Sequence, residues 1–210
     1  MELAVSVTIK TVVFPTETDS DYVELIARKP LDLAAFTLCM RVATELSCKR
    51  EVILFAYRTP NADELNVWRE QDGRLSLYLR SSSEAVHFQV PQFGALETHL
   101  CVTWDSSSGA TALFLDGRRS LTKIYKMGHR VQSGGRVILG QDLDSYWGSF
   151  EAKQSFVGEI SDVNMWDSVL PDSTIQRMSS GNREPRGNVF EWEAIQFEIH
   201  GGATVLNREL

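Results

Sequence analysis

Short β-forming runs separated by turn residues follow one another along nearly the whole of this 210-residue chain. Pairs such as Asp72-Gly73 and Asp116-Gly117 fall between the runs, and helical segments do not alternate with them. Many short strands at this spacing predict an all-β fold, a two-sheet jelly-roll or lectin-like sandwich, rather than a parallel βαβ sheet. The expected strands are 8–14, 22–27, 36–42, 52–57, 65–68, 75–79, 85–90, 99–104, 110–115, 136–139, 156–166 and 196–199.

A single short helix is expected near residues 171–180. Its apolar face contains Ile175 and Met178, and Gly181 follows as a stop signal. No internal repeat, low-complexity tract or linker is visible elsewhere. We therefore expect one domain that spans residues 1–210.

The charge balance narrows the classes of partner. Twenty-eight acidic residues against 21 lysines and arginines give a formal net charge of −7. Nucleic-acid binding is disfavoured, and an anionic ligand is repelled unless a bound cation intervenes. No apolar run approaches the roughly 18 residues of a membrane helix. The first residues are too few and too acidic for a signal peptide, so a removed signal before Met1 and a cytosolic chain both stay open.

Two of the three cysteines lie in alternating apolar strands. Cys39 and Cys101 have this setting, and a cysteine in mid-strand suggests one end of a bridge across a core. Two small buried thiols are an equally good interpretation of the residues alone. Cys48 lies in a polar turn and is expected to be a free surface thiol or an intermolecular link.

Residues 140–154 form a glycine-containing loop rich in oxygen donors. Asp142, Asp144, Glu151 and Gln154 supply carboxylates and an amide, which suit Ca²⁺. Histidine and cysteine are missing from the loop, which disfavours zinc, and the spacing does not match an EF-hand. The alternative is a solvated acidic loop.

Two motifs carry a resemblance to a known family. The pattern His99-x-Cys101-x-Thr103-Trp104 is similar to the signature of the pentraxins, and the segments 140–145 and 150–154 resemble their calcium loop. The resemblance covers nearly the whole chain. It implies a lectin-like jelly roll with one helix, a Cys39–Cys101 disulfide, a secreted protein and no enzymatic activity.

The resemblance also implies two Ca²⁺ ions per subunit. By this match the side chains of Asp142, Asp144, Glu151 and Gln154 are ligands, and Leu143 contributes its backbone carbonyl. The family completes its site with an Asp-Asn pair from a distant loop. In that place this chain has the segment 61–64, with Ala62 for the aspartate, Asp63 for the asparagine, and Asn61 expected to compensate.

The family's phosphocholine-binding members hold the choline between an apolar residue and a glutamate. The matching positions are Trp68 for the apolar wall and Glu84 for the carboxylate, and Tyr78 narrows the pocket. An equally weighted alternative is that Trp68 and Tyr78 are strand aromatics packed in a sheet.

The function implied is calcium-dependent pattern recognition in innate immunity, of the acute-phase type. The expected ligands are phosphocholine, phosphoethanolamine or related anionic and carbohydrate groups on microbial or damaged-cell surfaces. A cyclic homo-oligomer, with a pentamer expected, would raise avidity. Complement is a further expected partner through Asp116, although Ser179 replaces the assisting tyrosine. The alternatives are a glycoside hydrolase that uses Asp142 and Asp144, or a monomeric laminin-G-like adhesion module.

Overall fold

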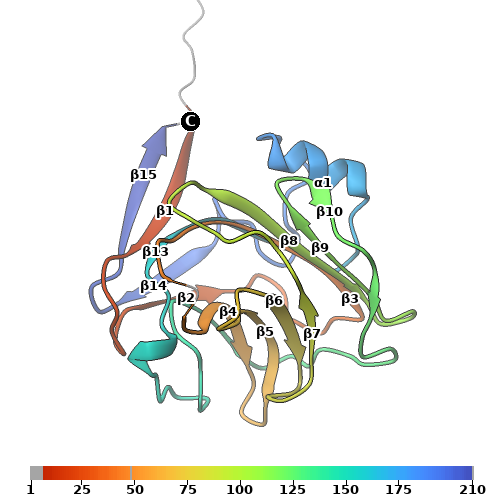
Figure 1. Cartoon of the computed structure of the whole chain (residues 1–210), viewed down its shortest axis with the longest axis horizontal. Coiled ribbons are helices and arrows are strands. Elements are labelled where there is room, and N and C mark those ends of the chain that lie inside the picture. Colours follow the sequence, from red (N-terminus) through yellow and green to blue (C-terminus); the bar gives the residue numbers. More distant parts are fainter. Residues whose placement is uncertain (1–6, 48, 210) are drawn as a thin grey trace, which may run out of the picture.

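Two antiparallel sheets pack face to face in the computed structural model, which describes residues 7–47 and 49–209 (Figure 1). One sheet has eight strands in the order β10-β9-β8-β3-β13-β1-β15, with β11 also paired to β9. Its strands are β1 (Thr8–Phe14), β3 (Ala35–Ala43), β8 (Thr98–Asp105), β9 (Ala110–Leu115), β10 (Arg118–Arg119), β11 (Lys123–Ile124), β13 (Gly158–Trp166) and β15 (Thr204–Glu209).

The other sheet has seven strands in the order β14-β2-β12-β4-β5-β6-β7. They are β2 (Tyr22–Ile26), β4 (Val52–Arg58), β5 (Asp63–Arg69), β6 (Leu75–Leu79), β7 (Ala85–Phe88), β12 (Arg136–Leu139) and β14 (Gln196–His200). The two-sheet sandwich predicted from the spacing of the strands is confirmed.

The helix was predicted correctly, because α1 spans Asp172–Ser179. Four elements were not predicted: the 3₁₀ turn η1 (Ala152–Gln154), the two-residue strands β10 and β11, and the C-terminal strand β15. Within the described residues no helix has the length and apolar character that crossing a membrane requires.

The core lies between the sheets and is built from the inward faces of their strands. Trp104, Phe36, Phe55 and Trp192 are among its fully buried side chains. Trp104 Nε1 donates to Tyr125 O at 2.9 Å, so this large ring is buried with its polar atom satisfied.

The Cys39–Cys101 disulfide is present, and it closes a sequence separation of 62 residues. In the chain-entropy model such a bridge stabilises the fold by roughly 4 kcal/mol. Its position corrects one expectation, because the two cysteines face each other on the adjacent strands β3 and β8 of one sheet. The bridge therefore does not cross the core; it packs beneath α1 on the outer face of the eight-stranded sheet, with Trp166 and Met178. Cys48 lies outside the described residues.

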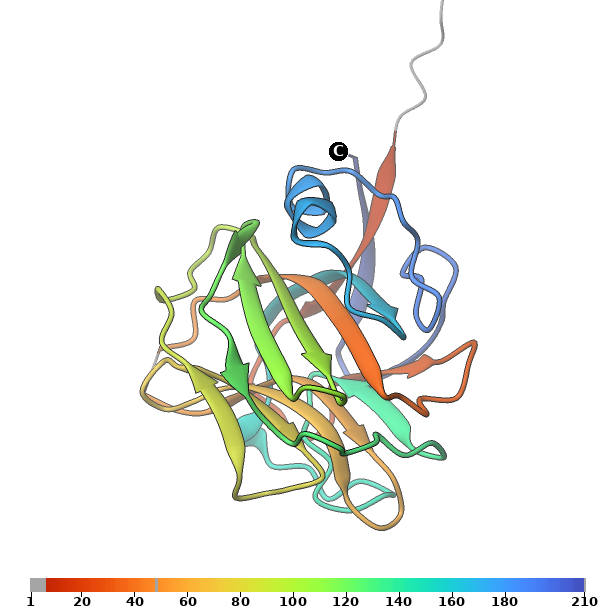
Figure 2. The ribbon, with the colours of Figure 1, turned by 90° about the vertical axis from the view of Figure 1, so that its right-hand side faces the viewer.

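The outer face of the seven-stranded sheet holds a second apolar cluster. Leu143, from the loop between β12 and η1, packs there on Ile53, Ala56, Trp68 and Ile138. Figures 1 and 2 show this loop and the β4–β5 turn together at the lower end of the molecule, whereas α1 lies at the top. Residues from two distant parts of the sequence therefore meet at the end away from the helix.

Candidate metal and ligand site

The base of the acidic loop is fixed by backbone and side-chain contacts. Gly140 has φ +95°, and a Cβ there would lie 2.3 Å from the ring of Phe14, so a larger residue does not fit. Its carbonyl accepts the N–H of Phe156 at 2.9 Å, which joins the two ends of the loop. The buried Gln141 donates to Thr18 O at 2.6 Å, and Leu143 is fully buried. Asp142 and Asp144 are therefore held by anchored neighbours.

Asp142 is the most enclosed of the predicted carboxylate ligands, at 8% exposed. Burial, followed by the nearby charges of Asp63 and Asp144, raises its pKa to about 7. Its Oδ1 accepts from Asn66 Nδ2 at 3.2 Å. Asn66 lies in β5, where its Oδ1 in turn accepts the backbone N–H of Tyr57 at 3.2 Å.

Asp144 belongs to the same cluster. Burial raises its pKa, and the charges of Glu151 and Asp63 add to the shift. Asp63 comes from the start of β5, about eighty residues earlier in the chain. Asp63, Asp142, Asp144 and Glu151 thus lie close enough for their charges to act on one another.

Arg58 is a member of the cluster that the sequence did not indicate. Its Nη1 lies 2.6 Å from Asp63 Oδ1, and both side chains are about one-fifth exposed. Its positive charge lowers the pKa values of Asp142 and Asp144, against the larger effect of burial. Asn66 was also missed, although a polar residue inside the apolar run Leu65–Trp68 was a visible signal.

The remaining predicted ligands, Glu151, Gln154 and Asn61, make their hydrogen bonds and ion pairs with residues other than Asp63, Asp142 and Asp144. Glu151 is about half exposed and pairs with Lys153 at 2.9 Å. Gln154 Nε2 donates to Glu51 at 3.4 Å, while Gln154 Oε1 is buried and has no hydrogen-bond partner among the described residues. Asn61 is exposed in the β4–β5 turn, where its backbone N–H donates to Thr59 Oγ1.

The donor set fits Ca²⁺. Four carboxylates and an amide oxygen supply hard oxygen ligands, and the buried Gln154 Oε1 is an acceptor that lacks a donor. A divalent cation here would also offset the mutual repulsion that contributes to the raised pKa values of Asp142 and Asp144.

The three predicted ligand-binding residues, Trp68, Tyr78 and Glu84, lie on β5, on β6 and in the turn between β6 and β7. Trp68 is 9% exposed and packs on Leu143, so little of its ring is open. Tyr78 stands opposite Asn66 and donates its hydroxyl to Glu70 at 2.9 Å; burial raises its pKa. Glu84 is exposed, and its pairing with Lys126 at 2.9 Å lowers its pKa.

Ser76 and His87 are in contact on the same sheet face as Trp68 and Tyr78. Ser76 Oγ lies 2.5 Å from His87 Nδ1, and Glu70 Oε1 lies 3.9 Å from the same nitrogen. In a nucleophile–base–acid relay the serine and the acid contact opposite ring nitrogens, so this arrangement is not such a relay.

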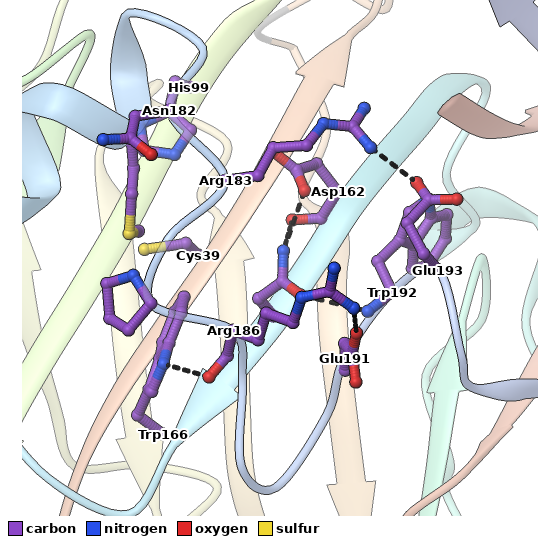
Figure 3. A pocket seen from close by; sticks show the side chains of 13 residues that line it. Cys39, His99, Asp162, Trp166, Asn182, Arg183, Arg186, Glu191, Trp192 and Glu193 are labelled. Carbon is purple, nitrogen blue, oxygen red and sulfur yellow. Dashed lines mark hydrogen bonds and ion pairs between the residues drawn. The ribbon is translucent and has the colours of Figure 1, made fainter. Parts of the chain in front are cut away.

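A separate pocket of about 100 Å³ opens on the outer face of the eight-stranded sheet, remote from the acidic cluster (Figure 3). Its wall is held by an Arg186–Glu191 pair at 2.8 Å and by Trp166 Nε1, which donates to Arg186 O at 2.9 Å. His99 lines it beside the disulfide, and burial lowers the pKa of His99 to about 4. The signature histidine is therefore a buried structural residue.

Comparison with known proteins gives a consistent result. Residues 10–207 match the sequence model of the Pentaxin family. The chain is 55% identical to "C-reactive protein" of Danio rerio over 93% of its length and 88% of the relative's. It is 40% identical to "Serum amyloid P-component" of Homo sapiens, covering 91% of this chain and 84% of that protein. The heptameric SAP-like pentraxin of Limulus polyphemus superposes with a TM-score of 0.81 at 25% identity, over 94% of each chain.

Proposed function

The chain belongs to the pentraxin family, and from this premise we propose that it is a secreted, calcium-dependent pattern-recognition protein. Its ligands are phosphocholine, phosphoethanolamine or related anionic and carbohydrate groups, bound through two Ca²⁺ ions by one pentraxin domain. The observation that carries the proposal is the convergence of Asp63 from β5 with Asp142 and Asp144 from the loop after β12.

In this proposal the side chains of Asp142, Asp144, Glu151 and Gln154 hold calcium together with the Leu143 carbonyl. Asp63 reaches the same ions from β5, with Asn61 beside it in the turn. Calcium supplies coordination positions for phosphate or carboxylate oxygens, which allows an acidic protein to bind an anion.

The rest of the ligand lies over β5–β7 in this proposal. Tyr78 and Glu84 face the part of the ligand beyond the phosphate, where Glu84 suits a cationic ammonium group. The exposed edge of Trp68 offers a small apolar contact, since most of the ring packs under Leu143.

A glycoside hydrolase is less well supported. Asp142 is buried and hydrogen-bonded to Asn66, and the chain is similar to proteins named C-reactive protein, serum amyloid P-component and SAP-like pentraxin, none of which is named as a hydrolase. Retaining and inverting hydrolases need two carboxyl groups that flank an open sugar cleft. We therefore propose binding without catalysis.

The relatives also support a proposal that this protein assembles into a closed ring and is extracellular. A relative of the same fold is heptameric, and a closed ring would present many weak sites on one face. The buried disulfide suits an extracellular protein. Complement is a further proposed partner, although the Asp116 carboxylate accepts the backbone N–H of His99 at 2.9 Å and so has a structural role as well.

Two measurements test the proposal. The first is calcium-dependent retention on phosphoethanolamine resin, and the second is calorimetric titration of calcium into chelator-treated protein. The wild type should bind calcium and be retained, and Asp142→Asn should weaken calcium binding at least tenfold and lose retention. Asp172→Asn, a change of an exposed carboxylate on α1, is the matched control and should behave as wild type. Retention that survives chelator would contradict the proposal.

A further inference from the structure

One tryptophan differs from all the others in this chain. Four of the five are at most 9% exposed, whereas Trp147 is 85% exposed. A tryptophan that remains in water forgoes the large gain from burial that its ring offers. Its position is in the acidic loop, three residues after Asp144 and four before Glu151.

The tip that carries Trp147 is braced. Ser145 and Gly148 exchange two backbone hydrogen bonds, of 3.0 and 3.2 Å, so the chain reverses at Tyr146 and Trp147. The two aromatic rings meet edge to face, with their centroids 4.8 Å apart. Trp147 therefore projects from a closed turn.

The brace continues into the sheet through Arg136. Its Nη1 donates to Tyr146 O at 2.8 Å, and its guanidinium lies 6.0 Å from the centre of the Tyr146 ring. Glu24 holds the same guanidinium with contacts of 3.0 and 2.7 Å. The tip thus has a fixed support on β2 and β12.

The chemistry of the tip suits the headgroup layer of a membrane. Trp147 and Tyr146 combine apolar rings with a polar N–H and O–H, the combination that is enriched at membrane–water interfaces. Their neighbours Ser145, Gly148 and Ser149 are small and uncharged, so the tip introduces no unpaired charge into that layer. A phosphate bound at the adjacent acidic cluster would bring the lipid surface to the tip.

We propose that the Tyr146–Trp147 tip anchors this protein in the headgroup layer of a phospholipid bilayer whose phosphate groups the calcium site binds. This inference rests on the proposed function. It adds that the site favours headgroups embedded in a bilayer over the same headgroup free in solution. Trp147 provides the difference, because it gains burial only when a lipid surface is present.

The fluorescence of Trp147 gives a direct test, since the other four tryptophans are buried. The probe is phosphatidylcholine vesicles, with soluble phosphocholine as the comparison. With calcium, vesicles should shift the emission to shorter wavelength and reduce acrylamide quenching. Chelator should abolish both changes, and soluble phosphocholine should produce neither.

The variant Trp147→Ala should lose about tenfold or more in vesicle affinity, because its apolar burial is removed. Its calcium affinity and its affinity for soluble phosphocholine should stay as in the wild type. Leu96→Ala, which removes an 85% exposed apolar side chain elsewhere on the surface, is the matched control and should not alter vesicle binding.

Three results would overturn the anchor. The first is wild-type vesicle binding with no change in emission, and the second is a Trp147→Ala variant that keeps its vesicle affinity. The third is an equal loss of soluble phosphocholine binding in that variant, which would make Trp147 a contact for the free ligand. If the wild type binds neither the vesicles nor soluble phosphocholine in the presence of calcium, the proposed function is refuted, and the anchor with it.

Discussion

Arg58 is the cation closest to the clustered carboxylates, with Nη1 2.6 Å from Asp63 Oδ1. Its Nε is buried without a hydrogen-bond partner among the residues described, so its place is set by charge more than by a full set of hydrogen bonds. Arg58 therefore acts as a counter-charge for Asp63, Asp142 and Asp144.

We expect Arg58→Gln to lower the melting temperature of chelator-treated protein by several degrees. The reason is that the carboxylates lose their counter-charge, at about 1 kcal/mol or more for a partly buried pair. With saturating calcium the loss should be smaller. Thermal unfolding with and without calcium measures both values. Arg74→Gln, which removes the more exposed pair with Asp72, is the control, and an equal loss in both conditions would contradict this role.

Asp142 predicts an unusual dependence on pH. Its pKa is about 7 in the fold against an ordinary value of 3.8, so the folded state binds the extra proton. Stability of the chelator-treated protein should therefore fall as pH rises from about 4 to about 7, and calcium affinity should rise over the upper part of that range. Thermal unfolding between pH 5 and 8 tests this. Asp142→Asn should remove this contribution, and an identical pH slope in both proteins would contradict it.

At the scale of elements, the loop after β12 is held by its apolar residue as much as by its polar ones. Leu143 was predicted as a ligand through its backbone carbonyl. The structure gives its side chain a packing role, fully buried against Ile53, Ala56, Trp68 and Ile138. Its burial fixes the backbone of the loop between Asp142 and Asp144 against the sheet.

Leu143→Ala should destabilise the protein by about 2 kcal/mol or more and loosen the loop, because it opens a cavity on the sheet. Protease cleavage within 140–154 should quicken, and calcium should protect the loop less than in the wild type. Limited proteolysis with and without calcium measures this effect. Leu121→Ala, a change of a 67% exposed side chain, is the control. A cleavage rate equal to that of the wild type would show that Leu143 is not the anchor.

The strands with several apolar residues in an alternating or continuous run were predicted from the sequence, whereas β15 and the two-residue strands β10 and β11 were missed. β15 was missed because it is an edge strand whose residues are mostly exposed, which removes the apolar alternation. The prediction that the disulfide crosses the core was wrong. Alternation gives the face of Cys39 and Cys101 on each strand, but it does not show which strands pair. Pairing is a property of the folded sheet.

Some residues of the candidate site were predicted from the sequence, and others were missed. Asp142, Asp144, Glu151 and Gln154 were predicted because they lie within one short loop and resemble a family motif. Asn66 and Arg58 come together with them only through strand register: Arg58 pairs with Asp63 beside an irregularity of β4 and β5. Local sequence could not indicate those contacts.

On the scale of the whole molecule, the sandwich separates two surfaces. α1 and the disulfide lie on the outer face of the eight-stranded sheet, whereas the acidic loop lies on the outer face of the seven-stranded sheet (Figures 1 and 2). A ring built from such subunits can present every metal site on one side and leave the helices on the other.

We expect the purified protein to form a closed oligomer, with a pentamer as the leading expectation. Light scattering coupled to size-exclusion chromatography gives the mass of the assembly directly. Retention on phosphoethanolamine resin should be stronger for the ring than for dissociated subunits because of avidity. A monomer that still binds calcium would support the adhesion-module alternative instead.

The most direct measurement is a crystal structure of the protein grown with calcium and phosphocholine. The expected result is calcium held by Asp63, Asp142, Asp144, Glu151, Gln154 and the Leu143 carbonyl, at about 2.3–2.6 Å, with phosphate oxygens completing the coordination. Phosphocholine bound elsewhere, or calcium absent from these residues at a saturating concentration, would contradict the account.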